Sequence, residues 1–429
     1  MEAEDAKKLH RAKYWTKLDA GSNDVQCRLC PRNCVIRDSR RGFCGVRKNI
    51  GGILYSLVYG KAVSLHVDPI EKKPLYHFYP GTEILSFGTI GCNLACKFCQ
   101  NWEISKAKPE EYPVEDVTPE QIVQAAIDRG CRSIAYTYTE PTIFFEYVLD
   151  TAKLARKRGI KNVLVTNGYM NEEPFNELYR YIDAANVDLK AFTQKFYADM
   201  ASSRLQPVLD TLKRIVDQRK KGKINTWLEI TNLIIPGLND SFPQIEKMCG
   251  WINENLGDDV PLHFSKFFPM YMAVDRLPTP KETLVNAYKA AKRVGLKYVY
   301  IGNLWTEKED DTYCQKCRKL LISRIGMRVE KNIIKNGRCP ECGELIAGVW
   351  DDAGSSAAES AKQKEEETKE DKSKEPTSAE KCGKIDEADE GVIARCGIKK
   401  KHGYLYYIDK NGNIACTKMN RKGRKKKKI

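Results

Sequence analysis

The sequence contains no uninterrupted apolar run of 18 or more residues, so no membrane-spanning helix is expected. Its first residues, Met1-Glu2-Ala3-Glu4-Asp5, are acidic and include no apolar segment, so a secretory signal is not expected either. Internal repeats are also absent from the sequence. We therefore expect a cytoplasmic protein that makes no membrane contact.

Positively and negatively charged residues are nearly balanced over most of the chain. The net charge is +15, but residues 391–429 contain 13 Lys or Arg and a single acidic residue, Asp409, and therefore carry +12. The other 390 residues carry only +3. The main body is thus nearly neutral, and the basic signal belongs to the tail.

The sequence does have a globular composition and many cysteines. Its 429 residues suggest about two or three folding units, and 42% hydrophobic and 30% charged residues exclude disorder of the whole chain. The 16 cysteines fall mostly in short-spaced clusters. In a large chain without a signal segment, such clusters favour metal sites in a reducing compartment over disulfides.

An alternation of apolar runs and amphipathic stretches begins near residue 83. It predicts an α/β fold with a parallel sheet, arranged as a partial (β/α)6 barrel. Thr118 and Thr279 each precede a proline, which is typical of a helix N-cap. Residues 1–20 predict a short amphipathic helix, and 52–80 predict short strands. The expected barrel strands are 83–90, 133–138, 162–166, 184–189, 225–234, 261–268 and 297–302, and the expected helices are 119–129, 142–158, 172–182, 204–220, 241–256 and 281–294.

These patterns divide the chain into five segments. The barrel ends where the β/α periodicity stops, near Asn303, and the linker is recognised by its Ala, Ser, Glu and Lys with few large apolar residues. The predicted domains are an N-terminal cysteine-cluster region (1–82), the barrel (83–305), a zinc-ribbon-like module (306–350), a flexible linker (351–390) and a basic β-hairpin tail (391–429).

Three cysteines in a C-x3-C-x2-C pattern follow the first predicted barrel strand. Cys92, Cys96 and Cys99 can hold three irons of a 4Fe–4S cluster, which leaves the fourth iron open to a small molecule. The carboxyl end of a barrel strand is where such barrels place their active sites. The alternatives are a zinc site that lacks one ligand, or chance spacing.

This loop, its position and the β/α pattern resemble the radical S-adenosylmethionine (radical SAM) superfamily. The likeness is closest to the glycyl-radical-enzyme activating group, exemplified by pyruvate formate-lyase activating enzyme. Within that group, the stretches VDPIEKKPLYHF, GTIGCNLACKFCQNWEIS, YTEPT, LIIPGLND, HFSKFFP and YVYIGN are similar to the AmmeMemoRadiSam system radical SAM enzymes, over about residues 20–349.

The resemblance implies a reaction and partners. A reduced 4Fe–4S cluster would cleave S-adenosylmethionine to methionine and a 5′-deoxyadenosyl radical, which abstracts hydrogen from a substrate that the sequence does not identify and that could be a protein. Reduced flavodoxin or ferredoxin would supply the electron, and Memo-type and AMMECR1-type proteins would be functional partners. The alternatives are an activase that installs a glycyl radical and, in another class, a zinc-containing nucleic-acid-binding protein.

The resemblance also assigns cofactor-binding residues. Phe98 would contact the adenine, although it could be a core phenylalanine. Thr139 and Glu140 stand where the superfamily has the end of a Gly-Gly-Glu-Pro segment that contacts the methionine amino group. Thr139 replaces a glycine there, and Glu140 could instead be a solvated loop charge.

Two further strand ends carry assigned residues. Asn167 could reach the ribose or simply make the turn. Asp188 and Lys190 match the Asp-x-Lys that activating enzymes place around the methionine carboxylate, with a buried ion pair as the alternative.

Two positions depart from the activating enzymes and weaken the case for a glycyl-radical substrate. Gln100 replaces the histidine after the third cysteine, and Tyr271 replaces a histidine after the sixth strand. Tyr271 and His263 are the catalytic candidates beyond the cluster. His263 could equally be a core histidine.

Two other cysteine groups have metal-site spacing. Cys314, Cys317, Cys339 and Cys342 form two C-x2-C knuckles, which predict a structural zinc site; the alternatives are rubredoxin-like iron and a second iron–sulfur cluster. The N-terminal group, which consists of Cys27, Cys30, Cys34 and Cys44, could hold zinc or an iron–sulfur cluster. Cys131 and Cys249 are expected to be buried apolar residues.

The tail combines aromatic and basic residues. Residues 404–415 predict a hairpin with an Asn411-Gly412 turn. Aromatic residues beside basic runs could bind a polyanion such as nucleic acid. The alternatives are a solvated extension or an anchor for an acidic partner.

Overall fold

A computed structural model describes residues 9–18, 21–304, 306, 308–350, 404–408 and 414–418. The chain divides into two compact units, Met1–Ser360 and Ala361–Ile429. The predicted linker, 351–390, lies outside the described residues. No helix in the described part of the chain is long and apolar enough to cross a membrane.

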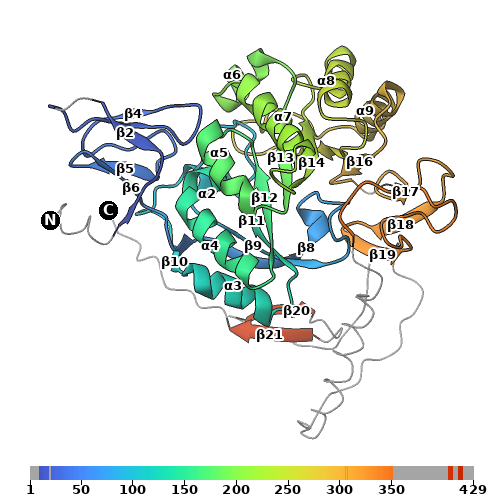
Figure 1. The fold of residues 1–429 in the computed structure, drawn as a ribbon, viewed down its shortest axis with the longest axis horizontal. Coiled ribbons are helices and arrows are strands. Elements are labelled where there is room, and N and C mark those ends of the chain that lie inside the picture. Colours follow the sequence, from blue (N-terminus) through green and yellow to red (C-terminus); the bar gives the residue numbers. More distant parts are fainter. Residues whose placement is uncertain are drawn as a thin grey trace, which may run out of the picture. The chain divides into compact units, whose positions relative to one another are not determined.

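An eight-stranded sheet forms the centre of the first unit (Figure 1). Its strand order is β16-β15-β14-β13-β12-β11-β9-β8; all neighbours pair in parallel except the edge strand β8, which is antiparallel to β9. The predicted α/β class is therefore confirmed. The strands are β8 (Ser64–Pro69), β9 (Glu83–Gly88), β11 (Ser133–Tyr136), β12 (Lys161–Thr166), β13 (Ala184–Asp188), β14 (Trp227–Ile234), β15 (Leu262–Lys266) and β16 (Val299–Gly302).

Helices connect successive parallel strands, as the sequence predicts. Two short helices, α2 and α6, were not expected, and both lie next to the loops that follow strands of the sheet. The helices are α2 (Trp102–Lys106), α3 (Pro119–Asp128), α4 (Phe145–Lys157), α5 (Glu172–Leu178), α6 (Gln194–Ala201), α7 (Gln206–Lys220), α8 (Phe242–Asn255) and α9 (Lys281–Val294), with 3-10 turns η1 (Ile70–Lys72), η2 (Pro141–Phe144) and η3 (Tyr179–Tyr181).

The two faces of the sheet belong to different cores, because successive strand residues point to opposite sides. On β9, Leu85 and Phe87 pack in the large core with the buried sides of the helices. Ile84 packs on the other face, with Phe78 from the segment after β8. The sheet is thus covered by helices on one face and by a connecting segment on the other.

The two expected helix caps behave differently. The Thr118 hydroxyl accepts a hydrogen bond from the Gln121 amide, and the Gln121 side chain reaches back to the Thr118 amide, so a capping box begins α3. Thr279 does not cap α9. Its hydroxyl donates to the Ile234 carbonyl at 2.6 Å and accepts from the Phe267 amide at 2.8 Å. It therefore ties the ends of β14 and β15 together.

The predicted helix at residues 1–20 is wrong over the part that the structure describes, which is 9–18. This segment contains two short strands, because β1 pairs with the distant β6 and β2 pairs with the neighbouring β3. Such backbone pairing outweighs local helix propensity. The N-terminal strands are β1 (His10–Arg11), β2 (Trp15–Lys17), β3 (Val25–Cys27), β4 (Val35–Ile36), β5 (Arg47–Ile50), β6 (Ile53–Ser56) and β7 (Lys61–Ala62), and β7 pairs with β10 (Glu115–Asp116).

A small three-stranded sheet follows β16. It consists of β17 (Thr312–Tyr313), β18 (Leu320–Ile325) and β19 (Arg328–Asn332). Its core includes Tyr298 and Tyr300 from around β16 as well as Cys314 and Cys339. This segment therefore shares a core with the central sheet.

The second unit contains an antiparallel pair, β20 (Tyr404–Ile408) and β21 (Ile414–Lys418). The predicted hairpin strands are confirmed. The Asn-Gly turn and the final basic run lie outside the described residues, so polyanion binding stays a prediction.

His77 joins the sheet to the segment after β19. Its ring is buried, with Nδ1 2.6 Å from the Ala347 carbonyl and Nε2 2.6 Å from the Tyr300 hydroxyl. Burial lowers the pKa of His77 to about 4. The ring is therefore neutral at pH 7: it donates to Ala347 and accepts from Tyr300.

We predict that this histidine makes folding sensitive to acid. Its pKa is about 4 in the folded chain against 6.5 when unfolded, so its contribution is complete above about pH 6.5 and is lost as the pH falls towards 4. The free energy of unfolding should fall by about 3 kcal/mol more over this range in the wild type than in His77→Gln. Denaturant titrations at several pH values would measure this difference. Equal pH slopes in the two proteins would contradict it.

Candidate active site

The C-x3-C-x2-C loop follows β9 at the carboxyl edge of the parallel strands. Its backbone is held by the two unexpected helices: the Lys97 amide donates to the Met200 carbonyl at 2.9 Å, and the Ala95 amide donates to the Ala201 carbonyl at 3.0 Å. The Gly91 amide donates to the Ile104 carbonyl of α2 at 3.0 Å. The loop conformation is therefore fixed by α2 and α6.

The sulfur atoms of this loop lie in apolar surroundings. Burial raises the pKa of the Cys92 and Cys96 thiols; at Cys96 the nearby Lys190 ammonium opposes this effect. The Cys92 sulfur accepts from the Leu94 amide at 3.4 Å, and the Cys99 sulfur is 3.4 Å from the Ser105 hydroxyl. Thiolates at such positions need a positive partner, which a metal centre provides.

The spacing of these sulfur atoms indicates what kind of centre fits. Among the described residues, the three sulfurs do not form a group in which all ligand atoms lie within 4.8 Å of one another. A single ion needs such a compact group, whereas in an iron–sulfur cube each thiolate binds a different iron and the sulfurs stand farther apart. The three sulfurs are therefore not arranged as a compact one-ion site among the described residues.

Asp188 and Lys190 form an ion pair beside the loop. Lys190 Nζ is 2.7 Å from Asp188 Oδ2 and 6.0 Å from the centre of the Phe98 ring. Burial would lower the pKa of Lys190, but Asp188 and Cys96 together hold it above its usual value. The structure thus brings Phe98, Asp188 and Lys190 together next to Cys96.

Glu140 is completely buried and engaged with its own chain. Oε1 accepts from the Thr142 amide at 3.0 Å, the Thr142 hydroxyl at 2.6 Å and the Thr166 hydroxyl at 2.7 Å, and Oε2 accepts from the Asn167 amide at 2.8 Å. Burial raises its pKa, although these donors oppose the shift. These contacts position the ends of β11 and β12, and Glu140 is not a solvated loop charge.

Asn167 and Thr139 are also held by the chain. The side-chain nitrogen Nδ2 of Asn167 donates to Asn93 Oδ1 at 2.8 Å and lies 3.9 Å from the Cys92 sulfur. The side-chain oxygen Oδ1 of Asn167 accepts from the Tyr169 backbone amide at 2.9 Å. The Thr139 hydroxyl donates to the Thr89 carbonyl at 2.8 Å. Asn167 therefore makes the turn and also supports the cysteine loop.

The two catalytic candidates lie in different environments. The Tyr271 ring stacks on Trp102 with ring centres 5.3 Å apart, and the neighbouring Met272 amide donates to the Lys97 carbonyl at 2.9 Å. His263 is buried in the first half of β15, with Nε2 2.7 Å from Glu229 Oε2. Only Tyr271 is thus brought to the cysteine loop, and the contacts of His263 are those of a core histidine.

A charged group near the loop was missed by the sequence reasoning. Buried Asp68 binds Lys72 through Oδ1 and Lys73 through Oδ2, each at 2.7 Å, and the Tyr138 hydroxyl donates to Oδ2 at 3.3 Å. The Tyr138 carbonyl accepts from Asn101, which follows the cysteine loop, at 2.9 Å. The signal was the Asp-x3-Lys-Lys pattern at the end of β8.

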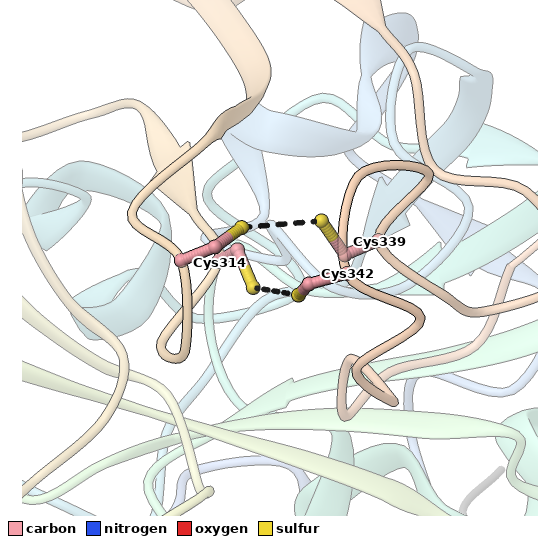
Figure 2. A group of neighbouring side chains, drawn as sticks. Cys314, Cys339 and Cys342 are labelled. Carbon is pink, nitrogen blue, oxygen red and sulfur yellow. Dashed lines mark hydrogen bonds between the residues drawn. The ribbon is translucent and has the colours of Figure 1, made fainter.

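The C-terminal cysteines do form a compact group. The sulfurs of Cys314, Cys317, Cys339 and Cys342 all lie within 4.8 Å of one another. Cys314 and Cys342 are 3.6 Å apart, and Cys317 and Cys339 are 3.7 Å apart (Figure 2). A tetrahedron with metal–sulfur bonds of 2.3 Å has edges of about 3.8 Å. This group can hold one metal ion.

The N-terminal cysteines surround a different kind of space. Cys27, Cys30, Cys34 and Cys44 all line one small cavity, and Asn93 of the cysteine loop lines it too. Cys249 is buried in α8, and Cys131 is buried just after α3, as expected.

Comparisons with known proteins point in one direction. A family model described as the radical SAM superfamily matches residues 87–249. MJ0808 of Methanocaldococcus jannaschii, described as an uncharacterized protein, is 44% identical over 340 residues, which cover 79% of this chain and 99% of that protein. The pyruvate formate-lyase-activating enzyme of Clostridium pasteurianum is 23% identical over 171 residues, or 38% of this chain and 66% of the enzyme. Among solved structures, a radical SAM methyltransferase from Sphaerobacter thermophilus matches with a TM-score of 0.41 and 16% identity, over 53% of this chain and 68% of that chain.

We predict that Glu140→Gln destabilises the fold. The Glu140 carboxylate accepts four hydrogen bonds. The glutamine side chain would turn an N–H group towards at least one of these four donors. The free energy of unfolding should fall by about 2 to 3 kcal/mol, measured by denaturant titration. Glu172→Gln, at an exposed position of α5, is the control and should change it by less than about 0.5 kcal/mol. Equal effects of the two changes would contradict the positioning role of Glu140.

Proposed function

Because the chain belongs to the radical SAM superfamily, we propose that it is an enzyme that cleaves S-adenosylmethionine at a 4Fe–4S cluster bound by Cys92, Cys96 and Cys99. The superfamily implies both cofactors. When bound, they supply one-electron cleavage of S-adenosylmethionine and hydrogen abstraction from a substrate. The observation that carries this proposal is a loop of three partly buried cysteines at the carboxyl edge of the sheet, whose sulfurs, among the described residues, do not form a compact one-ion group.

The charged residues beside the loop would orient the cofactor. The Lys190 ammonium lies near Cys96 and can neutralise a carboxylate, while Asp188, whose side chain is 37% exposed, can accept from an amino group. The nearby Phe98 ring offers an apolar surface to a base. In this proposal, Glu140 and Asn167 act indirectly, because their polar atoms are occupied in holding the loop and the strand ends.

The substrate is proposed to be presented by a protein. Residues 267–277 follow β15 and expose several large apolar side chains, among them Met272 at 61%, Val274 at 68% and Leu277 at 79%. The hydrogen bond from Met272 to Lys97 fixes this segment to the cysteine loop. Exposed apolar groups beside a reactive site favour docking of another macromolecule. The proposed partners remain Memo-type and AMMECR1-type proteins, with flavodoxin or ferredoxin as the electron donor.

A glycyl-radical activase is the second candidate. The similarity to the activating enzyme of Clostridium pasteurianum favours it. Gln100 and Tyr271 replace histidines of the activating enzymes, and this favours a different substrate. An electron paramagnetic resonance signal from a glycyl radical on an added partner would distinguish the activase from the first candidate.

We also propose that Cys314, Cys317, Cys339 and Cys342 bind a structural zinc ion. Their sulfur separations of 3.6 and 3.7 Å match a zinc tetrathiolate, and four protein ligands leave no open position for chemistry. The site shares a core with Tyr298 and Tyr300. Zinc would therefore stabilise the packing at the β16 edge of the sheet.

The cluster assignment predicts that Cys96→Ala abolishes turnover. Loss of one of three thiolates should prevent stable assembly at this loop. After anaerobic reconstitution and reduction, the variant should form no 5′-deoxyadenosine from S-adenosylmethionine, as measured by chromatography. Cys249→Ala, which changes a buried cysteine in α8, is the matched control and should retain activity. Continued product formation by Cys96→Ala would disprove the assignment.

The zinc assignment predicts one zinc per chain in protein purified in air, because zinc has no redox chemistry to lose. Cys342→Ala should remove that zinc and lower the melting temperature by roughly 8 °C, since loss of a structural metal costs on the order of 4 kcal/mol. Metal analysis and thermal unfolding would measure both effects. Iron in place of zinc in the folded wild type would show that the assignment is wrong.

A further inference from the structure

The N-terminal cysteines converge on a cavity that polar and apolar groups enclose. Cys27 ends β3, Cys30 and Cys34 lie on the turn before β4, and Cys44 precedes β5. The Cys27 amide donates to the Cys34 carbonyl at 2.9 Å, which closes the turn. The cavity is lined by these four cysteines with Leu29, Arg32, Ile36, Gly42, Arg47, Asn93 and Ile143.

A buried arginine in this cavity has donors that no described residue satisfies. The Arg47 side chain is 1% exposed, and its Nη2 donates to Glu146 Oε1 and to the Lys13 carbonyl, each at 2.7 Å. Its Nε and Nη1 are buried without a hydrogen-bond partner among the described residues. Unsatisfied buried donors are rare and costly, so they indicate a group that accepts from them. In a cavity lined by thiols, that group would be an anionic metal–thiolate centre.

The sulfur spacing separates a cluster from a single ion. The Cys314 group shows how this chain arranges a one-ion site, with all four sulfurs within 4.8 Å. Among the described residues, no three of the N-terminal sulfurs meet that condition, although all four cysteines line one cavity. The sulfurs of Cys92, Cys96 and Cys99 in the proposed radical SAM loop likewise do not meet that condition. We infer that Cys27, Cys30, Cys34 and Cys44 bind a second iron–sulfur cluster, of the 4Fe–4S type, and that Arg47 donates hydrogen bonds to its sulfur atoms.

The inferred cluster would lie next to the Cys92 loop. A side chain at Gly91 would come within 2.6 Å of the Cys44 carbonyl, so the two segments are in direct backbone contact. The Arg32 side chain donates to the carbonyl of Asn93, which lines the cavity and follows Cys92. The two cysteine sites therefore share one wall. This adjacency rests on contacts of the chain and does not depend on the proposed function.

Iron content tests the inference without altering the N-terminal site. The full chain, reconstituted anaerobically with ferrous iron and sulfide, should contain about 8 iron and about 8 sulfide per chain. The triple variant Cys92→Ala/Cys96→Ala/Cys99→Ala should keep about half of each, with a 4Fe–4S signal after reduction. A triple variant without iron, with two zinc ions per chain, would overturn the inference. If the proposed function is wrong and Cys92 holds no cluster, the wild type and the triple variant will contain equal iron, so the two failures are distinguishable.

The role of Arg47 has its own readout. In the triple variant, Arg47→Lys retains the positive charge but lacks the planar donors, so the midpoint potential of the remaining cluster should become more negative. Arg324→Lys is the matched control, because Arg324 is also buried but lies in the core around Tyr76 and Tyr300. A potential unchanged by Arg47→Lys, with cluster content retained, would contradict hydrogen bonding by Arg47. Should Arg47→Lys fail to fold, the iron count of the triple variant still decides the inference.

Discussion

The burial of cysteine sulfur atoms is the constraint on which the organisation of this chain depends. Thiols at Cys92, Cys96, Cys27 and Cys44 lie where the surroundings disfavour a bare thiolate. In the proposed sites, metal binding would resolve this cost and link deprotonation to folding. The sulfurs around Cys314 form a compact group, whereas among the described residues those of the other two cysteine groups do not.

The parallel sheet brings the residues of the proposed site to one edge. The cysteine loop, the Asp188–Lys190 pair and the turn at Asn167 all follow strands, so they meet at the carboxyl ends of β9, β13 and β12. Buried hydrogen bonds make this arrangement rigid: Glu140 joins two strand ends, and Asn167 supports Asn93 beside Cys92. The proposed reactive centre would need such a fixed frame, because its ligands must stay aligned.

The sequence predicts the parts of this structure that depend on local pattern. Buried strands and amphipathic helices leave periodic signals, so the alternation from residue 83 onward was predictable. The pairing of residues 10–11 with β6 was not, because it depends on a partner far along the chain. The same holds for the site. Cysteine spacing marks the loop, whereas the hydrogen bonds that occupy Glu140, the burial of His263 against Glu229 and the support from α6 arise only when distant segments meet.

The most direct test of the account is a Mössbauer measurement on protein in which only the Cys92 loop can hold iron, prepared with 57Fe in the variant Cys27→Ala/Cys30→Ala/Cys34→Ala/Cys44→Ala. If three thiolates leave one iron open, adding S-adenosylmethionine should shift the signal of about one iron in four. An identical spectrum before and after addition, in protein that contains the cluster, would contradict the claim that this loop binds S-adenosylmethionine at an open iron.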